Sequence, residues 1–201
     1  MEGVVTLKSS LKSTAYDYIL SRIIRCDYMP KTYIDAAQIS RELGISRTPV
    51  RDAISRLESE GLVTVTPRHG IMVSEIPANE VDNISKARKL LEPYAVSVAC
   101  KSADKVVMED FRSRFLSVGS KEEQIQVEYD FNIYLMSLTQ NDYMIQTMER
   151  VYTSNFRVQT MGMIQTGETS AFMELIDCII EGRSSDATGV VIRLISAEGI
   201  F

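Results

Sequence analysis

The stretch GISRTPVRDAISRLESEG, residues 44–61, decides how the first third of this chain is interpreted. Four apolar side chains recur along it at helical spacing: Val50, Ala53, Ile54 and Leu57. This pattern predicts an amphipathic helix with one buried face. Arg47 and Arg51 are four residues apart and therefore project together from the opposite face. Two arginines opposite a buried face indicate a helix whose exposed side binds a partner outside its own domain.

Both ends of this helix are marked in the sequence. Ser46 is a good N-cap, and Pro49 falls in the first turn, where its missing N–H removes no intrahelical hydrogen bond. Gly61 suits the left-handed conformation that ends many helices. The helix is therefore expected to begin after Ser46 and to end before Gly61.

Two further helices are expected upstream. Residues 11–25 carry an apolar side chain at every fourth position, which is the amphipathic-helix pattern. Asp35 can cap a second helix, AAQISREL, which stops at Gly44. The first third of the chain thus holds three short helices in sequence.

Two short strands are expected after the third helix. LVTVT at 62–66 and IMVSE at 71–75 flank PRHG at 67–70, which makes a hairpin with a basic tip. Three helices followed by a two-stranded wing is the order of a winged helix-turn-helix domain, whose third helix places its N-terminal turn in the DNA major groove. Arg47 and Arg51 occupy that turn, and an arginine fork can bond guanine O6 and N7 together or a phosphate.

The distribution of charge places any DNA-binding surface in this first third. The formal net charge of the 201 residues is -5, although nucleic-acid-binding proteins usually carry a basic excess. Residues 1–75 hold 10 Lys and Arg and 9 Asp and Glu, so their net charge is +1. The remainder holds 12 basic and 18 acidic residues, a net charge of -6, and is not expected to meet DNA.

The rest of the chain shows long helical patterns without a credible strand. Six helices are expected, over about 78–101, 104–117, 121–139, 142–160, 168–181 and 185–198. Such helices form a bundle, and bundles build their binding sites between facing helices. The expected fold class is mainly α, with a winged helix-turn-helix domain at 1–75 and an all-helical bundle at 76–201.

The N-terminal motif resembles the GntR family of bacterial transcription regulators. LGISRTPVRDAISRLESEGLV at 43–63, followed by RHG at 68–70, carries the likeness, which covers about residues 9–76. In that family the matching arginines contact DNA, the matching threonine helps, and the wing tip reaches the minor groove. The motif and the resemblance together give the candidate DNA-contacting residues Ser46, Arg47, Thr48, Arg51, Arg56, Arg68, His69 and Gly70.

Some of these assignments have a simpler alternative. Arg56 lies off the stripe of Arg47 and Arg51, so it contacts either a phosphate or an acidic neighbour. His69 is either a minor-groove probe or an exposed loop residue. Ala37 stands where some family members place a further DNA-contacting arginine, so a different sequence preference is expected.

The helical region resembles the effector-binding domain, of the FCD type, in the FadR-like branch of the GntR family. Three segments carry this likeness: KARKLLEPYAVSVAC at 86–100, FNIYLMSLTQND at 131–142 and ELIDCIIEGRSSDA at 174–187. The length of the region favours the shorter, six-helix version. The resemblance implies a domain that dimerises and binds a small effector.

Many members of this branch hold a divalent metal through one aspartate and three histidines. The matching positions here are Glu128, Asn132, Phe172 and Ile195, and the one histidine of the chain, His69, lies in the wing. Zinc or nickel needs several nitrogen or sulfur donors, and one carboxylate beside one amide does not supply them. No metal and no other cofactor is therefore expected.

A polar pocket inside the bundle is expected in place of the metal. Glu128 and Asn132 are four residues apart on a stripe with apolar neighbours, so they should point inward and require partners. The candidate effector-pocket residues are Arg88, Glu128, Asn132, Asn155, Arg157, Phe172 and Ile195. The alternative is that Arg88 and Glu128 pair with each other or with helix ends and so hold the bundle together. Phe172 and Ile195 would then belong to the core or to the pocket wall.

These features predict a homodimeric transcription regulator, with repression of its operator as the simpler default. A small-molecule effector, such as an organic acid, would alter the affinity for double-stranded operator DNA through the link at 74–79. A regulator that has lost its effector is the alternative. No enzyme is expected, because His69 is far in the architecture from the possible nucleophiles Cys100 and Cys178. Three cysteines without paired spacing and no apolar run of membrane length predict a cytoplasmic protein without a membrane partner.

Overall fold

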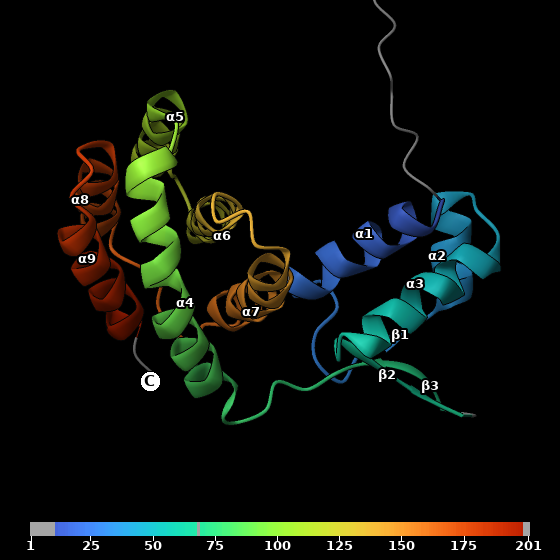
Figure 1. Ribbon diagram of the computed structural model, residues 1–201. Coiled ribbons are helices and arrows are strands. Elements are labelled where there is room, and N and C mark those ends of the chain that lie inside the picture. Colours follow the sequence, from blue (N-terminus) through green and yellow to red (C-terminus); the bar gives the residue numbers. More distant parts are fainter. Residues whose placement is uncertain (1–10, 68, 199–201) are drawn as a thin grey trace, which may run out of the picture. The chain divides into compact units, whose positions relative to one another are not determined.

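The chain divides into two compact units in the computed structural model, which describes residues 11–67 and 69–198. The first ends at Ile76 and is called the N-terminal unit, and the second begins at Pro77 and is called the helical unit. Figure 1 shows helices with a small sheet in the first and a bundle of helices in the second. None of the helices in the described part of the chain combines the length and apolar character that a bilayer crossing requires.

The N-terminal unit contains the three expected helices, α1 (Leu11–Ile24), α2 (Ala36–Leu43) and α3 (Arg47–Ser59). The residues at the apolar positions of α1 and α3 are buried and pack into one core, which includes Ile19, Ile23, Val50 and Leu57. Because these side chains recur at helical spacing, burying one face of each helix leaves the other face of α3 exposed.

The turn between α2 and α3 is built from local hydrogen bonds. The Asp35 carboxylate caps α2 by accepting the backbone N–H of Ala37 at 2.8 Å, as predicted. Gly44 ends α2 in the left-handed conformation, with φ at 64°. Ser46 occupies the predicted N-cap position of α3 and has an extended backbone. Its side chain, however, makes no capping hydrogen bond.

A three-stranded antiparallel sheet follows, with β1 (Tyr33–Ile34), β2 (Val63–Thr66) and β3 (Gly70–Val73) in the order β1-β3-β2. The hairpin of β2 and β3 confirms the predicted wing, with Thr66 opposite Gly70. The sheet has one strand that was not predicted, because β1 pairs with β3, placing Tyr33 opposite Met72. Two residues are too few to show a strand pattern, and their pairing is made only by tertiary structure.

The described part of the helical unit forms six helices close to the predicted ranges. They are α4 (Glu80–Ser102), α5 (Lys105–Ser117), α6 (Lys121–Ser137), α7 (Asp142–Thr160), α8 (Thr169–Ile180) and α9 (Ser184–Ala197). Long helix α4 packs against α6, α7, α8 and α9 and is the central element of the bundle. An aromatic cluster of Phe111, Phe115, Phe131 and Phe172 fills the core on the side of α5 and α8.

Gly44→Ala is expected to destabilise the N-terminal unit. A Cβ at this position meets no atom within 4 Å, so the cost comes from the left-handed backbone alone and is about 1 kcal/mol of unfolding free energy. Gly189→Ala, on the exposed face of α9 with equally open space, is the matched control and should stabilise the helical unit. Hydrogen exchange measured by mass spectrometry reports the stability of each unit separately. If both substitutions changed the stability of their units equally, the cost assigned to the left-handed backbone at Gly44 would be contradicted.

Candidate functional site

The N-terminal turn of α3 presents an exposed basic surface. Ser46, Arg47, Thr48 and Arg51 are all exposed, whereas Val50 on the opposite side of the helix is fully buried. Within the described ranges, neither arginine forms an ion pair with an acidic side chain. The two guanidinium groups are therefore available to an external anion.

The end of α3 holds Arg56 in a different environment. Its guanidinium lies over the Tyr16 ring at 3.7 Å from the centroid, and its Nε donates to Glu60 Oε1 at 3.0 Å. The hydroxyl of Tyr16 donates to Glu60 at 2.7 Å, and burial followed by this bond raises the pKa of Tyr16. Of the two predicted partners of Arg56, the structure shows the acidic neighbour.

The wing tip exposes His69 and Gly70. The backbone N–H of His69 donates to the Thr66 carbonyl at 3.1 Å, which closes the turn between the strands. Gly70 has φ at 101°, a conformation that glycine adopts readily and other residues do not. The predicted contact residue Arg68 lies outside the described residues.

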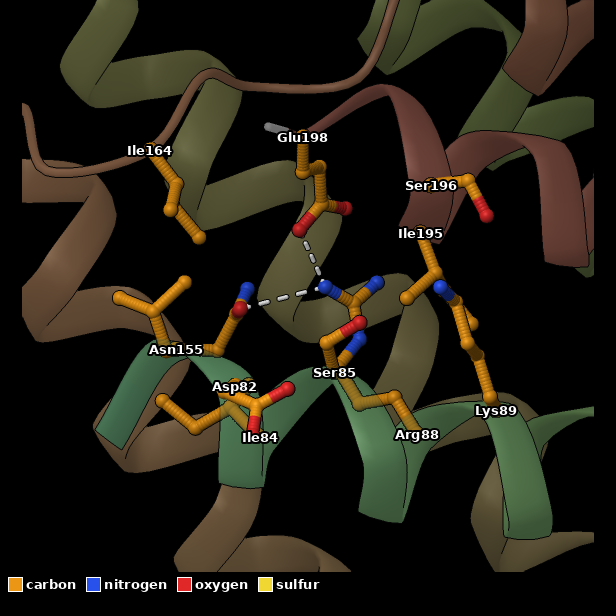
Figure 2. Close-up of a pocket in the computed structure, with 11 residues that line it drawn as sticks. Asp82, Ile84, Ser85, Arg88, Lys89, Asn155, Ile164, Ile195, Ser196 and Glu198 are labelled. Atoms are coloured by element: carbon orange, nitrogen blue, oxygen red, sulfur yellow. Dashed lines mark hydrogen bonds and ion pairs between the residues drawn. The ribbon is translucent and has the colours of Figure 1, made fainter. Parts of the chain in front are cut away.

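A cavity of about 260 Å³ opens in the helical unit beside the first turns of α4. Figure 2 shows Arg88 from α4, Asn155 from α7 and Glu198, the residue directly after α9, converging there. We call it the Arg88 cavity, and its walls include the polar side chains Arg88, Asn155 and Glu198 and the apolar side chains Ile84, Ile164 and Ile195.

Arg88 is the centre of a buried charged network. Its Nε donates to Glu92 Oε1 at 2.6 Å, and its Nη1 donates to Asn155 Oδ1 at 3.1 Å and to Glu198 Oε2. The side chains of Arg88 and Glu92 are each 4% exposed, and that of Glu198 is 5% exposed. Burial opposes the charge of Arg88, but Glu198 and Glu92 outweigh it and raise its pKa well above the ordinary value. Arg88 therefore remains a cation inside the bundle.

Glu128 lies in a separate buried cluster on α6. Its Oε1 accepts hydrogen bonds from the Gln124 side chain and the Gly167 backbone, each at 3.0 Å, and its Oε2 accepts from Gln159 at 2.8 Å. Burial, followed by the charge of Glu198, raises the pKa of Glu128 from 4.5 to about 8. Burial thus outweighs three hydrogen bonds that favour the carboxylate.

The structure brings together only part of the predicted pocket. Arg88, Asn155 and Ile195 line the Arg88 cavity, but Glu128, Asn132, Arg157 and Phe172 are not among its walls. Phe172 stacks on Phe115, with ring centroids 4.4 Å apart, and is a core residue.

Glu198 was not among the candidates, and it is the acidic residue that reaches Arg88 from α9. It follows Ile195 by three residues, so helical spacing alone would have placed both side chains on one face. The alternative in which Arg88 pairs with Glu128 is not formed, because Glu92 and Glu198 are the acidic partners of Arg88 instead.

The side chains at the positions of the family's metal ligands do not fit a metal. Both oxygens of Glu128 already accept hydrogen bonds, and the positions of two histidines hold Phe172 in the core and Ile195 in the cavity wall. Residues 11–67 and 69–198 contain no cluster of three His, Cys, Asp or Glu side chains placed to hold a metal ion. This donor set gives a divalent ion too few ligands.

The two thiols of the helical unit are poor nucleophiles. Cys100 donates to the Cys178 carbonyl with Sγ and O 3.9 Å apart. Burial raises the pKa of both thiols, which lowers the fraction present as the reactive thiolate. This environment favours a structural role for both residues.

Comparison with known proteins supports the assignment of the N-terminal unit. Residues 11–73 match the model of the family described as bacterial regulatory proteins, gntR family. The Nta operon transcriptional regulator of Aminobacter aminovorans is 30% identical over 132 residues, covering 62% of this chain and 61% of that protein. The uncharacterized HTH-type transcriptional regulator YdhC of Bacillus subtilis is 26% identical over 164 residues, covering 73% of each chain. The first of these matches thus spans less than two thirds of the relative's length.

Two solved structures share the fold over nearly the whole chain. McbR/YncC of E. coli superposes with a TM-score of 0.81 at 16% identity and covers 94% of both chains. A putative transcriptional regulator GntR from Rhodococcus sp. RHA1 superposes with a TM-score of 0.77 at 17% identity and covers 94% of this chain and 95% of that one. At these identities the likeness establishes the fold alone.

The sheet, the exposed turn of α3 and the matched family model define the N-terminal unit as a winged helix-turn-helix DNA-binding domain. This domain is similar to the DNA-binding domain of the gntR family, whose model matches residues 11–73.

Glu128→Gln is expected to change how stability depends on pH. Because the folded pKa is raised from 4.5 to about 8, the protonated acid contributes stability that is present at low pH and lost as pH rises through this range. The variant is neutral throughout, and rotation of the Gln159 amide can restore its hydrogen bond. Its unfolding free energy relative to the wild type should therefore rise by up to about 1.4 kcal/mol per pH unit between pH 5 and pH 8.

Denaturant titrations at several pH values measure this difference. Glu174→Gln, which removes an exposed carboxylate paired with Arg193, is the control and should parallel the wild type. A pH-independent difference for Glu128→Gln would contradict a raised pKa.

Proposed function

We propose that this protein regulates transcription as a homodimer, binding a near-palindromic operator through the exposed turn of α3 in each protomer. The observation that carries the proposal is the pair of exposed arginines, Arg47 and Arg51, at the point where the helix-turn-helix geometry meets the major groove. Ser46 and Thr48 add hydroxyl donors beside them, and His69 and Gly70 form the wing tip that would reach the minor groove. Repression by occupying a promoter is the simplest outcome of such binding.

A surface on α4 supports the homodimer. Leu90 and Tyr94 are 78% and 53% exposed and lie one turn apart, so one face of this helix leaves two large apolar side chains in water. A two-fold interface would bury the same face on both protomers. One winged domain reads only a few base pairs, so pairing also supplies the second half-site.

The Arg88 cavity supports control by a small molecule. It is bounded by the first turns of α4, and the link at residues 74–79 joins these turns to the DNA-binding domain. A ligand that binds better to one conformation of these turns would favour one disposition of the DNA-binding domains. The alternative, a regulator without an effector, draws support from the fact that Arg88 already has acidic partners.

Arg51→Ala is expected to remove base-specific affinity. Duplexes selected from a random pool by the wild-type protein supply the specific site, and fluorescence anisotropy gives its affinity. If Arg51 reads a guanine, the loss should be about 1 to 3 kcal/mol on the selected duplex, with relaxed preference at one position.

Arg56→Ala is the matched control on the same helix. Its side chain is held by Tyr16 and Glu60, so its loss should lower stability more than sequence preference. If Arg51→Ala lost the same affinity for selected and for random duplexes, Arg51 would contact only phosphate. If the wild-type protein selected no sequence from the random pool, the proposal would be overturned.

Leu90→Glu is expected to weaken the dimer. Burying an unpaired carboxylate in each half of a two-fold interface is unfavourable, and we expect at least about a tenfold rise in the dissociation constant. Analytical ultracentrifugation measures it. Tyr143→Glu, at a position on α7 that is 87% exposed, is the control. If Leu90→Glu dimerises as well as both the wild type and Tyr143→Glu, the interface lies elsewhere.

A further inference from the structure

Helix α3 and the wing are joined by a very short segment. Only residues 60–62 separate the end of α3 from the start of β2 (Figure 1). Gly61 adopts the left-handed conformation in this turn, with φ at 77°, and the Leu62 N–H donates to the Leu57 carbonyl at 2.9 Å. The turn therefore fixes the inner end of β2 against the last turn of α3.

The outer part of β2 is not held in the same way. Val63 at the inner end of the strand is buried, whereas Thr64, Val65 and Thr66 are exposed. The strand order is β1-β3-β2, so β2 is an edge strand, and β3 is its one neighbour in the described sheet. Packing against the core thus fixes only one end of β2, and the position of the wing tip relative to α3 depends on further contacts.

Glu58 supplies such a contact from α3. Its Oε1 accepts a hydrogen bond from the backbone N–H of Val65 at 3.1 Å. The donor lies on the free edge of β2, where a backbone N–H has no strand to pair with. An ionised acceptor makes a stronger hydrogen bond than a neutral one. One side chain of α3 therefore holds the outer part of the wing.

We propose that Glu58 is a positioning residue for DNA recognition, which holds the wing at a fixed angle to α3 so that both elements reach one duplex together. The inference deepens the proposed function and rests on it, because it names the side chain that links the two DNA-contacting elements. Arg47 and Arg51 lie at the start of α3, and His69 and Gly70 lie at the wing tip.

The physical effect is preorganisation. A wing that moves freely relative to α3 loses this freedom when it enters the minor groove, and the lost entropy opposes binding. A wing held by Glu58 has already lost it in the free protein. The second contact also helps the first only when the protein presents the two at a spacing that the duplex can match. Glu58 thus raises DNA affinity without touching DNA.

Two substitutions at Glu58 separate its hydrogen bond from its charge. Glu58→Ala and Glu58→Gln both remove a carboxylate that repels the DNA polyanion, but the amide oxygen of glutamine can still accept the Val65 N–H. Asp17→Ala, which removes an exposed carboxylate on α1, is the control for net charge. Glu58 is itself exposed, so both variants are expected to fold.

Hydrogen exchange measured by NMR without DNA tests the contact itself. The Val65 amide should exchange about three- to tenfold faster in Glu58→Ala than in the wild type, which is the effect of losing one net hydrogen bond. Glu58→Gln should restore slow exchange. The Val73 amide, which donates to the Thr32 carbonyl at 2.9 Å, reports on the rest of the sheet and should not change.

Fluorescence anisotropy with the duplex selected by the wild-type protein tests the consequence. Glu58→Ala should bind this duplex about three- to tenfold more weakly, by the same loss of one hydrogen bond. Glu58→Gln and Asp17→Ala should bind at least as tightly as the wild type. With the duplex bound, Glu58→Ala should keep the slowed exchange at the start of α3 but lose part of it in β2 and β3.

Three results would each overturn the inference. They are an unchanged Val65 exchange rate in Glu58→Ala, an unchanged DNA affinity in Glu58→Ala, and an equal loss of affinity in Glu58→Ala and Glu58→Gln. The failure of the proposed function has a different signature, because a wild-type protein that selects no DNA sequence would remove both. A wild type that binds its selected duplex no better than Glu58→Ala does would remove this inference alone.

Discussion

The helical unit depends on the pairing of Arg88, a cation buried inside the bundle. A guanidinium cannot be left without partners inside a bundle, because the hydrogen bonds it makes to water must be replaced. Arg88 meets this requirement with Glu92 on its own helix, Asn155 on α7 and Glu198 after α9. The constraint therefore links three helices that are distant in sequence, and it places charge beside the apolar wall of a cavity.

The same residue type has opposite roles in the two units. Arg47 and Arg51 are exposed at the start of α3 and remain hydrated, so neither has to give up a protein partner to contact DNA. Arg88 is buried, so any anion that reaches it must replace an existing partner rather than water. This difference separates an exposed basic surface, which suits a polyanion, from a buried cation that is already paired.

Much of the fold could be predicted because its signals are local. Asp35, Gly44 and Gly61 mark helix ends through their own backbone preferences, and helical periodicity identified six helices of the bundle within a few residues. Strand β1 was missed because its pairing with β3 depends on tertiary contacts. Exposure of the α3 turn followed from its apolar stripe. Inclusion of Glu198 in the cavity did not follow, because it depends on how α9 packs beside α4.

The central claim is that the exposed turn of α3 binds DNA through Arg47 and Arg51, and the most direct measurement is how the DNA dissociation constant depends on salt concentration. An arginine that pairs with a phosphate releases counterions, so each such contact adds about 1 to the slope of log affinity against log salt. Our account predicts weaker DNA binding and a shallower salt dependence when both arginines are replaced by alanine. A double variant with the affinity and the salt dependence of the wild type would contradict it.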